Sequence, residues 1–351
     1  MDDSLKPHPE RHGTKVLGVE WVPLDIPPRR RLQMLCVVVS FFIVVVLGPF
    51  STLLVAAGFF TRFWFLSLAY CVWMWYDWDT PNKGSRPKSW MRKWSVWKHF
   101  RDYFPINLHK TVDLDPDRNY IMGFHPHGMF SIGVFTNFLT EASNFSEKFP
   151  GITVYPMTLM VQFIFPIRRE ILTWLGAVGV SEPSIKYVIN EKRKGHLGII
   201  APGGTAEMFD ARPGRYRINL SKRKGFVRVA LQQGADLVPC FSFGENDLYD
   251  QTDYPEQSTT YKVQKWIQQN VGFPLLALHG RGIFNYNAGL LPFRRPINTV
   301  VGVPIKVEKV EHPTAEQINA LHQIYVEALQ EHFEKNKERF GLDPKLQLEI
   351  H

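Results

Sequence analysis

A long uncharged stretch near the N-terminal end limits what this chain can fold into. No charged residue occurs from Leu35 to Thr61, and after Arg62 none occurs again before Asp77. About 20 consecutive apolar residues are enough for a helix to cross the hydrocarbon core of a bilayer. The first run is long enough, whereas the second is short unless it begins near Phe59 and Arg62 reaches the interface. A buried hairpin in a soluble protein is the alternative, and the run length and the surrounding tryptophans argue against it.

Basic residues flank this region on both sides and predict its orientation. They are Arg29, Arg30 and Arg31 before it, and Lys83, Arg86, Lys88, Arg92 and Lys93 after it. Positive charge marks the cytosolic side of a membrane segment. Two passes, or one re-entrant hairpin with a bend at Gly48-Pro49, would place both ends there. We therefore expect a cytosolic segment at 1–33, a membrane-embedded helical hairpin at 34–78 and a cytosol-facing domain at 79–351.

Charge and cysteine content narrow the class of protein. The 351 residues carry a formal net charge of +8, which is compatible with nucleic acid, an anionic membrane surface or a polyanionic small substrate as partner. The sequence contains no zinc-finger spacing and no RNA-binding signature, so nucleic acid is the least favoured of the three. Only three cysteines occur, and Cys36 and Cys71 lie in apolar runs. This is not a disulfide framework, and a reducing compartment fits better.

Beyond about residue 100, apolar strands alternate with amphipathic helices. Such alternation predicts an α/β domain with a mainly parallel sheet covered on both faces. A capping-box pattern at Thr314 and Gln317 predicts the start of a long C-terminal helix. The expected strands are 119–124, 196–204, 236–244, 275–282 and 297–305, and the other expected helices are 129–142 and 224–235.

The stretch YIMGFHPHGMFSIG, from Tyr120 to Gly133, places His125 and His127 at the end of an apolar strand. One interpretation is a loop with structural histidines. A second is a metal site, but zinc needs three or four ligands, and no nearby residue at ligand spacing completes the set. A third is general-base catalysis, in which one histidine takes a proton from a hydroxyl and a carboxylate fixes its tautomer. A helix beginning after Gly128 would add N–H groups for a developing oxyanion.

The third interpretation requires a carboxylate from another loop. Glu207 follows an apolar strand and a turn at Gly203 and Gly204, in the sequence IIAPGGTAE. Because the carboxyl ends of parallel strands meet at one edge of a sheet, this turn can face the turn at His125–Gly128 (the histidine turn). Glu207 is therefore the candidate partner of His127. The alternative is a solvated residue in the first turn of a helix, where the helix dipole favours an acid.

Several segments together resemble a known family. They are Tyr103–Pro105, His125–Gly128, Gly203–Glu207, Arg223–Glu245, His279–Gly282 and Arg295–Ile305. Over nearly the whole chain, they resemble the monoacylglycerol/diacylglycerol acyltransferase family, type 2. The resemblance implies an N-terminal membrane hairpin followed by a glycerolipid-acyltransferase-like α/β domain. It also implies an endoplasmic-reticulum membrane enzyme, found at lipid droplets as well, whose catalytic domain we expect in the cytosol.

The resemblance implies an activity and residue roles. Such an enzyme esterifies a neutral glyceride hydroxyl, of monoacylglycerol or diacylglycerol, in triacylglycerol synthesis, with acyl-CoA as co-substrate and neither metal nor further cofactor. His127 would be the base and Glu207 its partner, while His125 would shape the catalytic loop. The residues implied for substrate binding are Gly128, Gly203, Gly204, Tyr103, Phe104 and Pro105.

The sequence departs from more distant relatives in an informative way. Glycerol-phosphate acyltransferases carry a Glu and an Arg in the loop that grips the acceptor phosphate, whereas this loop reads APGGTAE. Loss of both groups suits a neutral acceptor.

Two alternatives stay open: a wax-ester synthase using a long-chain fatty alcohol, and a non-catalytic lipid-droplet membrane protein. The expected partners include the lipid bilayer, and self-association into homo-oligomers is left open. The candidates for contacting CoA phosphates are Arg168, Arg169, Lys222, Arg223, Lys224, Arg294 and Arg295.

Overall fold

A seven-stranded sheet forms the centre of the part of the chain that the computed structural model describes, which is residues 14–351 except Leu24 and Glu191. Every neighbouring pair of strands is parallel except β12 and β9. The expected α/β class with a mainly parallel sheet is therefore confirmed. The strand order is β3 (Ile106–Lys110), β12 (Ile297–Val301), β9 (Asp236–Phe243), β4 (Tyr120–His125), β7 (His196–Ile200), β5 (Thr153–Thr158) and β6 (Val178–Gly179).

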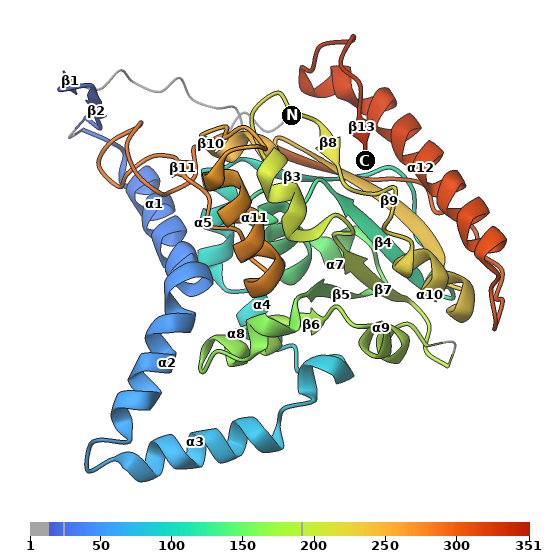
Figure 1. The fold of residues 1–351 in the computed structure, drawn as a ribbon, viewed down its shortest axis with the longest axis horizontal. Coiled ribbons are helices and arrows are strands. Elements are labelled where there is room, and N and C mark those ends of the chain that lie inside the picture. The colour runs from blue at the N-terminus through green and yellow to red at the C-terminus, as the bar shows by residue number, and fades with distance from the viewer. Residues whose placement is uncertain (1–13, 24, 191) are drawn as a thin grey trace.

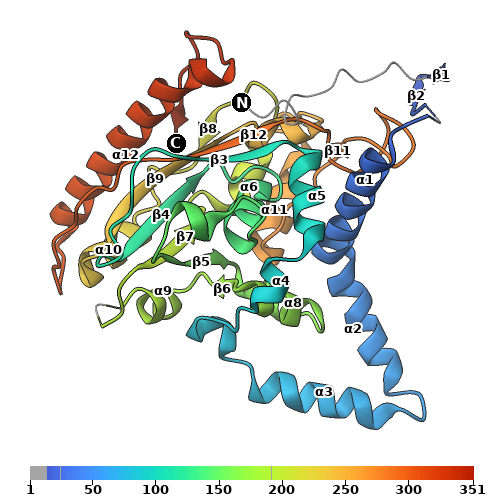
Figure 2. The same ribbon diagram turned by 180° about the vertical axis from the view of Figure 1, so that it is seen from behind.

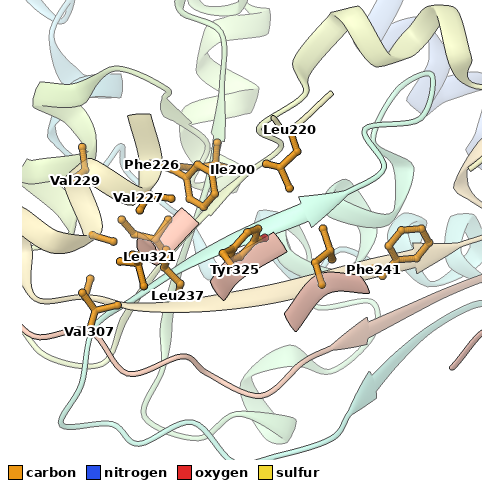
Figure 3. Packing of buried hydrophobic residues seen from close by; sticks show 14 of the residues in the cluster. Ile200, Leu220, Phe226, Val227, Val229, Leu237, Phe241, Val307, Leu321 and Tyr325 are labelled. Atoms are coloured by element: carbon orange, nitrogen blue, oxygen red, sulfur yellow. The ribbon is translucent and has the colours of Figure 1, made fainter. Parts of the chain in front are cut away.

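Strand β4 lies in the middle of this sheet and is buried along its whole length. Its side chains alternate between the two faces, as strand geometry requires. Ile121 belongs to a core formed with α10 (Gly225–Gln233) and α12 (Ala315–Lys337), which is drawn in Figure 3. Met122 and Phe124 belong to a second core on the opposite face. The strand is thus fixed from both sides, which gives the histidine turn at its carboxyl end a rigid base.

Local signals in the sequence predict several helix boundaries correctly. Helix α10 ends at Gly234, which adopts the left-handed conformation (φ +63°) that glycine tolerates best. Helix α12 begins with the expected capping box at Thr314 and Gln317. The single helix expected at 129–142 is instead a short α6 (Ile132–Val134) followed by a π-helical segment, η4 (Phe135–Leu139).

The expected strand at 275–282 is wrong. Only β11 (Leu278–His279) is extended, and it pairs with β10 (Asp250–Gln251) outside the main sheet. The glycines explain the difference, because Gly280 and its neighbour Arg281 form isolated bridges with a second loop at Gly289 and Leu291. A Cβ atom on Gly280 would lie 2.1 Å from the Leu291 carbonyl oxygen, so this close approach of two loops requires glycine.

The apolar N-terminal region forms one long helix and one short helix. Helix α1 (Pro28–Phe41), the π-helical η2 (Phe42–Val46) and α2 (Leu47–Gly58) join into 31 continuous residues, long and apolar enough to cross a membrane. The chain then turns at 59–63 into α3 (Trp64–Tyr76), whose 13 residues span about 20 Å, less than the roughly 30 Å of a hydrocarbon core. The expected hairpin of two crossing helices is therefore not confirmed. In both views α3 lies below the α/β body (Figures 1 and 2), which it contacts through the Tyr70 hydroxyl, the acceptor of the Ile167 N–H at 2.7 Å.

The bend expected at Gly48-Pro49 is also wrong. Both residues lie within α2, and the helix continues through them. A proline inside a helix cannot donate to the carbonyl four residues earlier. In the π-helical segment Phe42–Val46, immediately before α2, hydrogen bonds join residues five apart instead of four. The helix continues through its proline, and its axis changes direction between α1 and α2 (Figures 1 and 2).

The first half of the long helix packs on the α/β body. Met34, Cys36 and Val37 share a core with Phe100 of α5 (Ser95–Tyr103) and with Ile132 beside the histidine turn. Residues of the expected membrane segment at 34–78 therefore share a core with residues of the expected domain at 79–351. The remaining elements are β1 (Thr14–Val16), β2 (Val19–Trp21), η3 (Thr80–Lys83), α4 (Ser89–Arg92), α7 (Phe145–Lys148), η5 (Met160–Phe163), α8 (Arg168–Leu175), α9 (Glu182–Val188), η6 (Gly204–Asp210), β8 (Arg217–Ile218), η7 (Glu245–Leu248), α11 (Thr259–Val271), η8 (Glu338–Phe340) and β13 (Glu349–Ile350).

Candidate active site

His127 follows the carboxyl end of β4 and is partly exposed. Its ring Nδ1 lies 3.0 Å from the carbonyl oxygen of Gly128. A carbonyl oxygen can only accept, so Nδ1 carries the proton and Nε2 of the neutral ring holds the free electron pair. Burial lowers the pKa of His127, which the Gly128 carbonyl partly offsets, so the ring is neutral at pH 7. The arrangement provides a base at Nε2.

Glu207 lies in η6, directly after β7, and is 2% exposed. Its Oε2 accepts from the main-chain N–H of His127 at 2.7 Å, and its Oε1 accepts from that of Asn219 at 2.8 Å. Sequence reasoning correctly brought Glu207 to the histidine turn. The expected contact with the imidazole ring is corrected, because the carboxylate reaches the main chain and the Gly128 carbonyl fixes the ring instead.

Burial is the dominant influence on the ionisation of Glu207. It raises the pKa of the carboxyl to about 7, against the opposing effect of the two N–H groups. Asp210 in the same turn raises the pKa further, and Arg223 lowers it. Glu207 is therefore poised to change charge near neutral pH.

A second buried carboxylate, Glu245, holds the other side of the histidine turn. Its Oε1 accepts from the N–H of Ile132 at 2.6 Å, and its Oε2 accepts from that of Gly133 at 3.0 Å. The N–H groups of Ile132 and Gly133 are thus taken by Glu245. The N–H groups of Gly128 and Met129, earlier in the turn, are left as the oxyanion candidates.

Glu245 was not among the residues that the sequence singled out. A signal for it existed, because Glu245 follows β9, which is parallel to β4 and adjacent to it. Because the carboxyl ends of parallel strands meet at one edge of the sheet, Glu245 lies beside His127 just as Glu207 does.

His125 points away from His127. It is fully buried, and its Nε2 lies 3.0 Å from the hydroxyl of Tyr325 on α12, which in turn donates to the Gly123 carbonyl at 3.3 Å. Burial lowers the pKa of His125 to about 3, so the ring stays neutral. His125 ties the end of β4 to α12. These contacts agree with the expectation that His125 shapes the loop, and its place among the catalytic residues stays a prediction.

Three glycines expected at the substrate site differ in what they allow. Gly128 adopts φ +62°, and a Cβ atom there would lie 2.5 Å from Cγ of Glu245. A Cβ atom on Gly203 would lie 1.9 Å from Oε1 of Glu207. Gly204 adopts φ +59° with open space around it. Gly128 and Gly203 are therefore required by the two buried carboxylates, and Gly204 only by its backbone conformation.

The other residues expected to bind substrate lie deeper. Tyr103 and Phe104 are fully buried, and the Tyr103 hydroxyl donates to the Pro292 carbonyl at 2.8 Å. Pro105 connects α5 to β3, and its carbonyl accepts from the N–H of Ile297. Tyr103 and Phe104 belong to the core that also contains Met129 and Ile132, whereas Pro105 is partly exposed. Their role in substrate binding stays a prediction.

Asn219, which donates to Glu207, is held in place by residues distant in the sequence. Strand β13 pairs with β8 just before it. The carbonyl of His351 accepts from the N–H groups of Leu220 and Ser221, both at 2.8 Å, and the His351 N–H donates to the Ile218 carbonyl at 2.9 Å. The last residues of the sequence thus fix the loop that supports Glu207. No local pattern in the sequence signals this contact.

The basic residues expected to contact CoA phosphates fall into two groups, those that bond within the body and those that are exposed. Arg169 is fully buried in an ion pair with Asp77, 2.9 Å apart, and serves the fold. Lys222 and Arg223 are exposed on the loop after Asn219 and stay candidates. The others bond within the body: Arg168 to Gln162, Lys224 to Asn319, Arg294 to Gln33 and Arg295 to the Asp247 carbonyl. In the described part of the chain, no three His, Cys, Asp or Glu side chains gather as a metal ion would require.

Comparison with known proteins decides the family. A family model described as diacylglycerol acyltransferase matches residues 56–351. The chain belongs to the diacylglycerol acyltransferase family. It is 47% identical over 331 residues to 2-acylglycerol O-acyltransferase 1 from Bos taurus, covering 93% of this chain and 97% of that one. It is 44% identical over 322 residues to diacylglycerol O-acyltransferase 2 from Homo sapiens, covering 92% and 83%. A crystal structure of a 1-acyl-sn-glycerophosphate acyltransferase from Thermotoga maritima aligns with a TM-score of 0.40 at 13% identity, covering 88% and 96%.

The glycine pair of this diacylglycerol acyltransferase family member gives a first prediction. Gly203→Ala displaces the Glu207 carboxylate and should reduce acyl transfer about 10²-fold, as loss of positioning does. Gly204→Ala meets no atom and should cost about 1 kcal/mol of stability, because alanine is strained at positive φ. Acyl-transfer rates and Tm of the two purified variants test this. Full activity in Gly203→Ala would show that the carboxylate position is unimportant.

The ionisation of Glu207 gives a second prediction. The charged form holds both N–H groups, and the pKa of about 7 means that this form is lost as pH falls through 7. The rate should therefore decline on the acid side of pH 7, and Glu207→Gln should be slow without that dependence. Because burial also raises the pKa of Glu245 to about 7, Glu245→Gln is the matched comparison. The pH–rate profiles decide, and an acid limb that survives in Glu207→Gln but disappears in Glu245→Gln would reassign the titrating group.

Proposed function

We propose that this chain transfers a fatty acyl group from acyl-CoA to the hydroxyl of a monoacylglycerol or diacylglycerol, with His127 as the general base. Family membership makes it an O-acyltransferase of glycerides in triacylglycerol synthesis. The observation that carries the proposed mechanism is the Gly128 carbonyl on Nδ1 of His127, which leaves Nε2 as the base.

The reaction proceeds by direct transfer. Nε2 of His127 takes the proton of the glyceride hydroxyl while the hydroxyl oxygen forms a bond to the thioester carbonyl carbon. The N–H groups of Gly128 and Met129 stabilise the oxyanion. The carbon–sulfur bond then breaks, and the CoA sulfur takes the proton from the imidazolium. No covalent enzyme intermediate is needed, because a thioester is already activated.

Glu207 assists through charge and geometry. Its negative charge, close to the main chain of His127, stabilises the imidazolium that forms during the reaction. Its bond to the His127 N–H keeps the turn in the conformation that aims Nε2. The role is that of a positioning residue, since the carboxylate contacts the main chain and not the ring.

The two substrates have different chemistry. A glyceride is uncharged. The turn at Gly203 and Gly204 lacks the pair of Glu and Arg that binds a phosphate in glycerol-phosphate acyltransferases. CoA is polyanionic, and the exposed Lys222 and Arg223 beside the Glu207 loop suit its phosphates. Acyl-CoA as donor requires no further cofactor.

The N-terminal helices suit a membrane enzyme that works from the cytosolic side of the endoplasmic reticulum and at lipid droplets. The long helix supplies sufficient apolar length, and the shorter α3 suits a segment that enters the bilayer without crossing it. Basic residues on both flanks of 34–78 favour a cytosolic location for both ends.

The proposed function predicts that His127→Ala reduces acyl transfer about 10²–10⁴-fold, the usual contribution of a general base. The measurement uses labelled acyl-CoA and purified enzyme with monoacylglycerol, diacylglycerol and a long-chain alcohol as acceptors. Wild-type enzyme that esterifies only the alcohol would favour a wax-ester synthase, and a chain inert toward all three would favour a non-catalytic membrane protein. Normal turnover by His127→Ala would refute the base assignment.

The cytosolic location of the catalytic domain has its own test. Asn144-Phe145-Ser146 matches the N-glycosylation pattern, and Asn144 is exposed. Because glycosylation occurs only in the lumen, Asn144 should remain unmodified in cells, and a glycosidase should not change the mobility of the protein. A luminal glycoprotein treated in parallel is the control. A mobility shift that disappears in Asn144→Gln would place the catalytic domain in the lumen.

A further inference from the structure

An apolar segment at 159–167 lies in the part of the chain that the charge pattern assigned to the cytosol. It reads LMVQFIFPI and connects β5 to α8, with Gln162 as its one polar side chain. Three of its side chains are exposed: Leu159 by 37%, Ile164 by 45% and Ile167 by 39%. Large apolar side chains that are exposed together in one short segment indicate a contact with a further apolar partner.

The long apolar helix holds this segment from one side. The Ser51 hydroxyl of α2 donates to the Pro166 carbonyl at 2.6 Å. A Cβ atom on Gly48 would lie 3.0 Å from Cγ of Phe165, so the ring packs closely against the helix there. Gly48 and Ser51 are the two residues of α2 that the structure buries. Because residues three apart lie on one face of a helix, the two form one contact face for the segment.

The shorter helix α3 holds the next residue. The Ile167 N–H donates to the Tyr70 hydroxyl at 2.7 Å. Ile167 itself adopts φ +59° and ψ −49°, and the N–H of Arg168 donates to the Pro166 carbonyl at 2.5 Å. This γ-turn is of the rare, strained kind, and a β-branched residue is unusual at its centre. Strained backbone persists only where its surroundings hold it, and here both apolar helices do so.

These contacts fix the depth of the segment relative to α2 and α3. Ser51 lies about 10 Å from the end of α2 at Gly58, since a helix rises about 1.5 Å per residue. Tyr70 lies in the middle of α3. In both views α8, which begins directly after the segment, lies beside α2 (Figures 1 and 2). The segment is therefore level with the apolar stretches of both helices.

The polar groups of the segment are paired as a bilayer requires. Main-chain groups inside a bilayer need partners within the protein. The Pro166 carbonyl and the Ile167 N–H find theirs on the two apolar helices. Gln162 accepts a hydrogen bond from the guanidinium of Arg168, and polar side chains in membranes pair with one another in this way.

We propose that residues 159–167 enter the apolar part of the bilayer together with α2 and α3. The catalytic domain thus supplies a third membrane contact of its own, and the hydrocarbon chains of lipids cover Leu159, Ile164 and Ile167. The inference rests on the proposed membrane location and goes beyond it, because the domain expected at 79–351 contained no embedded segment.

The test uses the full-length enzyme in phosphatidylcholine nanodiscs, with a spin label on one introduced cysteine. Cys71→Ser removes the exposed native cysteine, whereas Cys36 and Cys240 are buried. Ile164→Cys then carries the label. Accessibility is measured to oxygen, which concentrates in hydrocarbon, and to a nickel chelate, which stays in water.

Two matched positions calibrate the measurement. Leu54→Cys, on α2, is the lipid reference, and Val303→Cys is the aqueous reference; the native side chains are 54% and 64% exposed. Val303 follows β12, which runs antiparallel to β9 and so ends at the edge of the sheet opposite the histidine turn. The label on Ile164→Cys should match that on Leu54→Cys, with higher oxygen accessibility and lower nickel accessibility than the label on Val303→Cys.

The outcomes separate this inference from the proposed location. An Ile164→Cys label in water beside a Leu54→Cys label in lipid would overturn the inference alone. A label on Ile164→Cys that is shielded from both reagents would also overturn it, since a protein partner would then cover the segment. A Leu54→Cys label in water would refute the proposed membrane location and the inference with it. Tm and acyl-transfer rate should equal those of Cys71→Ser, and Leu159→Cys replaces Ile164→Cys if they do not.

Discussion

One buried carboxylate joins the two loops from which this site is built. Glu207 accepts from the main chain of His127 with one oxygen and from that of Asn219 with the other. Hydrogen bonds to a charged group each contribute about 1.5–3 kcal/mol, but burial of the charge opposes them and raises the pKa of the group to about 7. The turn is thus fixed most firmly when Glu207 is charged. Glu245 secures the other side of the same turn, so its shape depends on two buried acids.

The long apolar N-terminal helix also packs against this site. Met34 and Val37 share a core with Met129 and Ile132, which flank the catalytic turn. This contact places the apolar helix and the proposed base on two sides of one narrow space. One wall of that space is therefore formed by a helix that is long and apolar enough to cross a membrane.

Sequence patterns brought the two candidate residues His127 and Glu207 together but did not predict which of their atoms meet. Alternating strands and helices predicted the parallel sheet, and the rule that strand ends share an edge brought Glu207 to His127. Which atom the carboxylate contacts depends on the detailed backbone conformation of two turns. The spacing of residues in the sequence does not determine that conformation. The burial of His125 could have been read from strand parity, since it shares a face with Ile121. The expected bend at Gly48-Pro49 is absent because α2 continues through both residues, and the hairpin stays unconfirmed.

The support of Asn219 by His351 has a consequence for the order in which the protein is made. Translation proceeds from the N-terminus, so the membrane helix, the histidine turn and Glu207 all emerge before residues 349–351. The amides of Leu220 and Ser221 have no carbonyl of His351 to bind until those residues have left the ribosome. The loop that supports Glu207 therefore lacks these hydrogen bonds until β13 has been synthesised, although the N-terminal helix and the histidine turn emerge earlier.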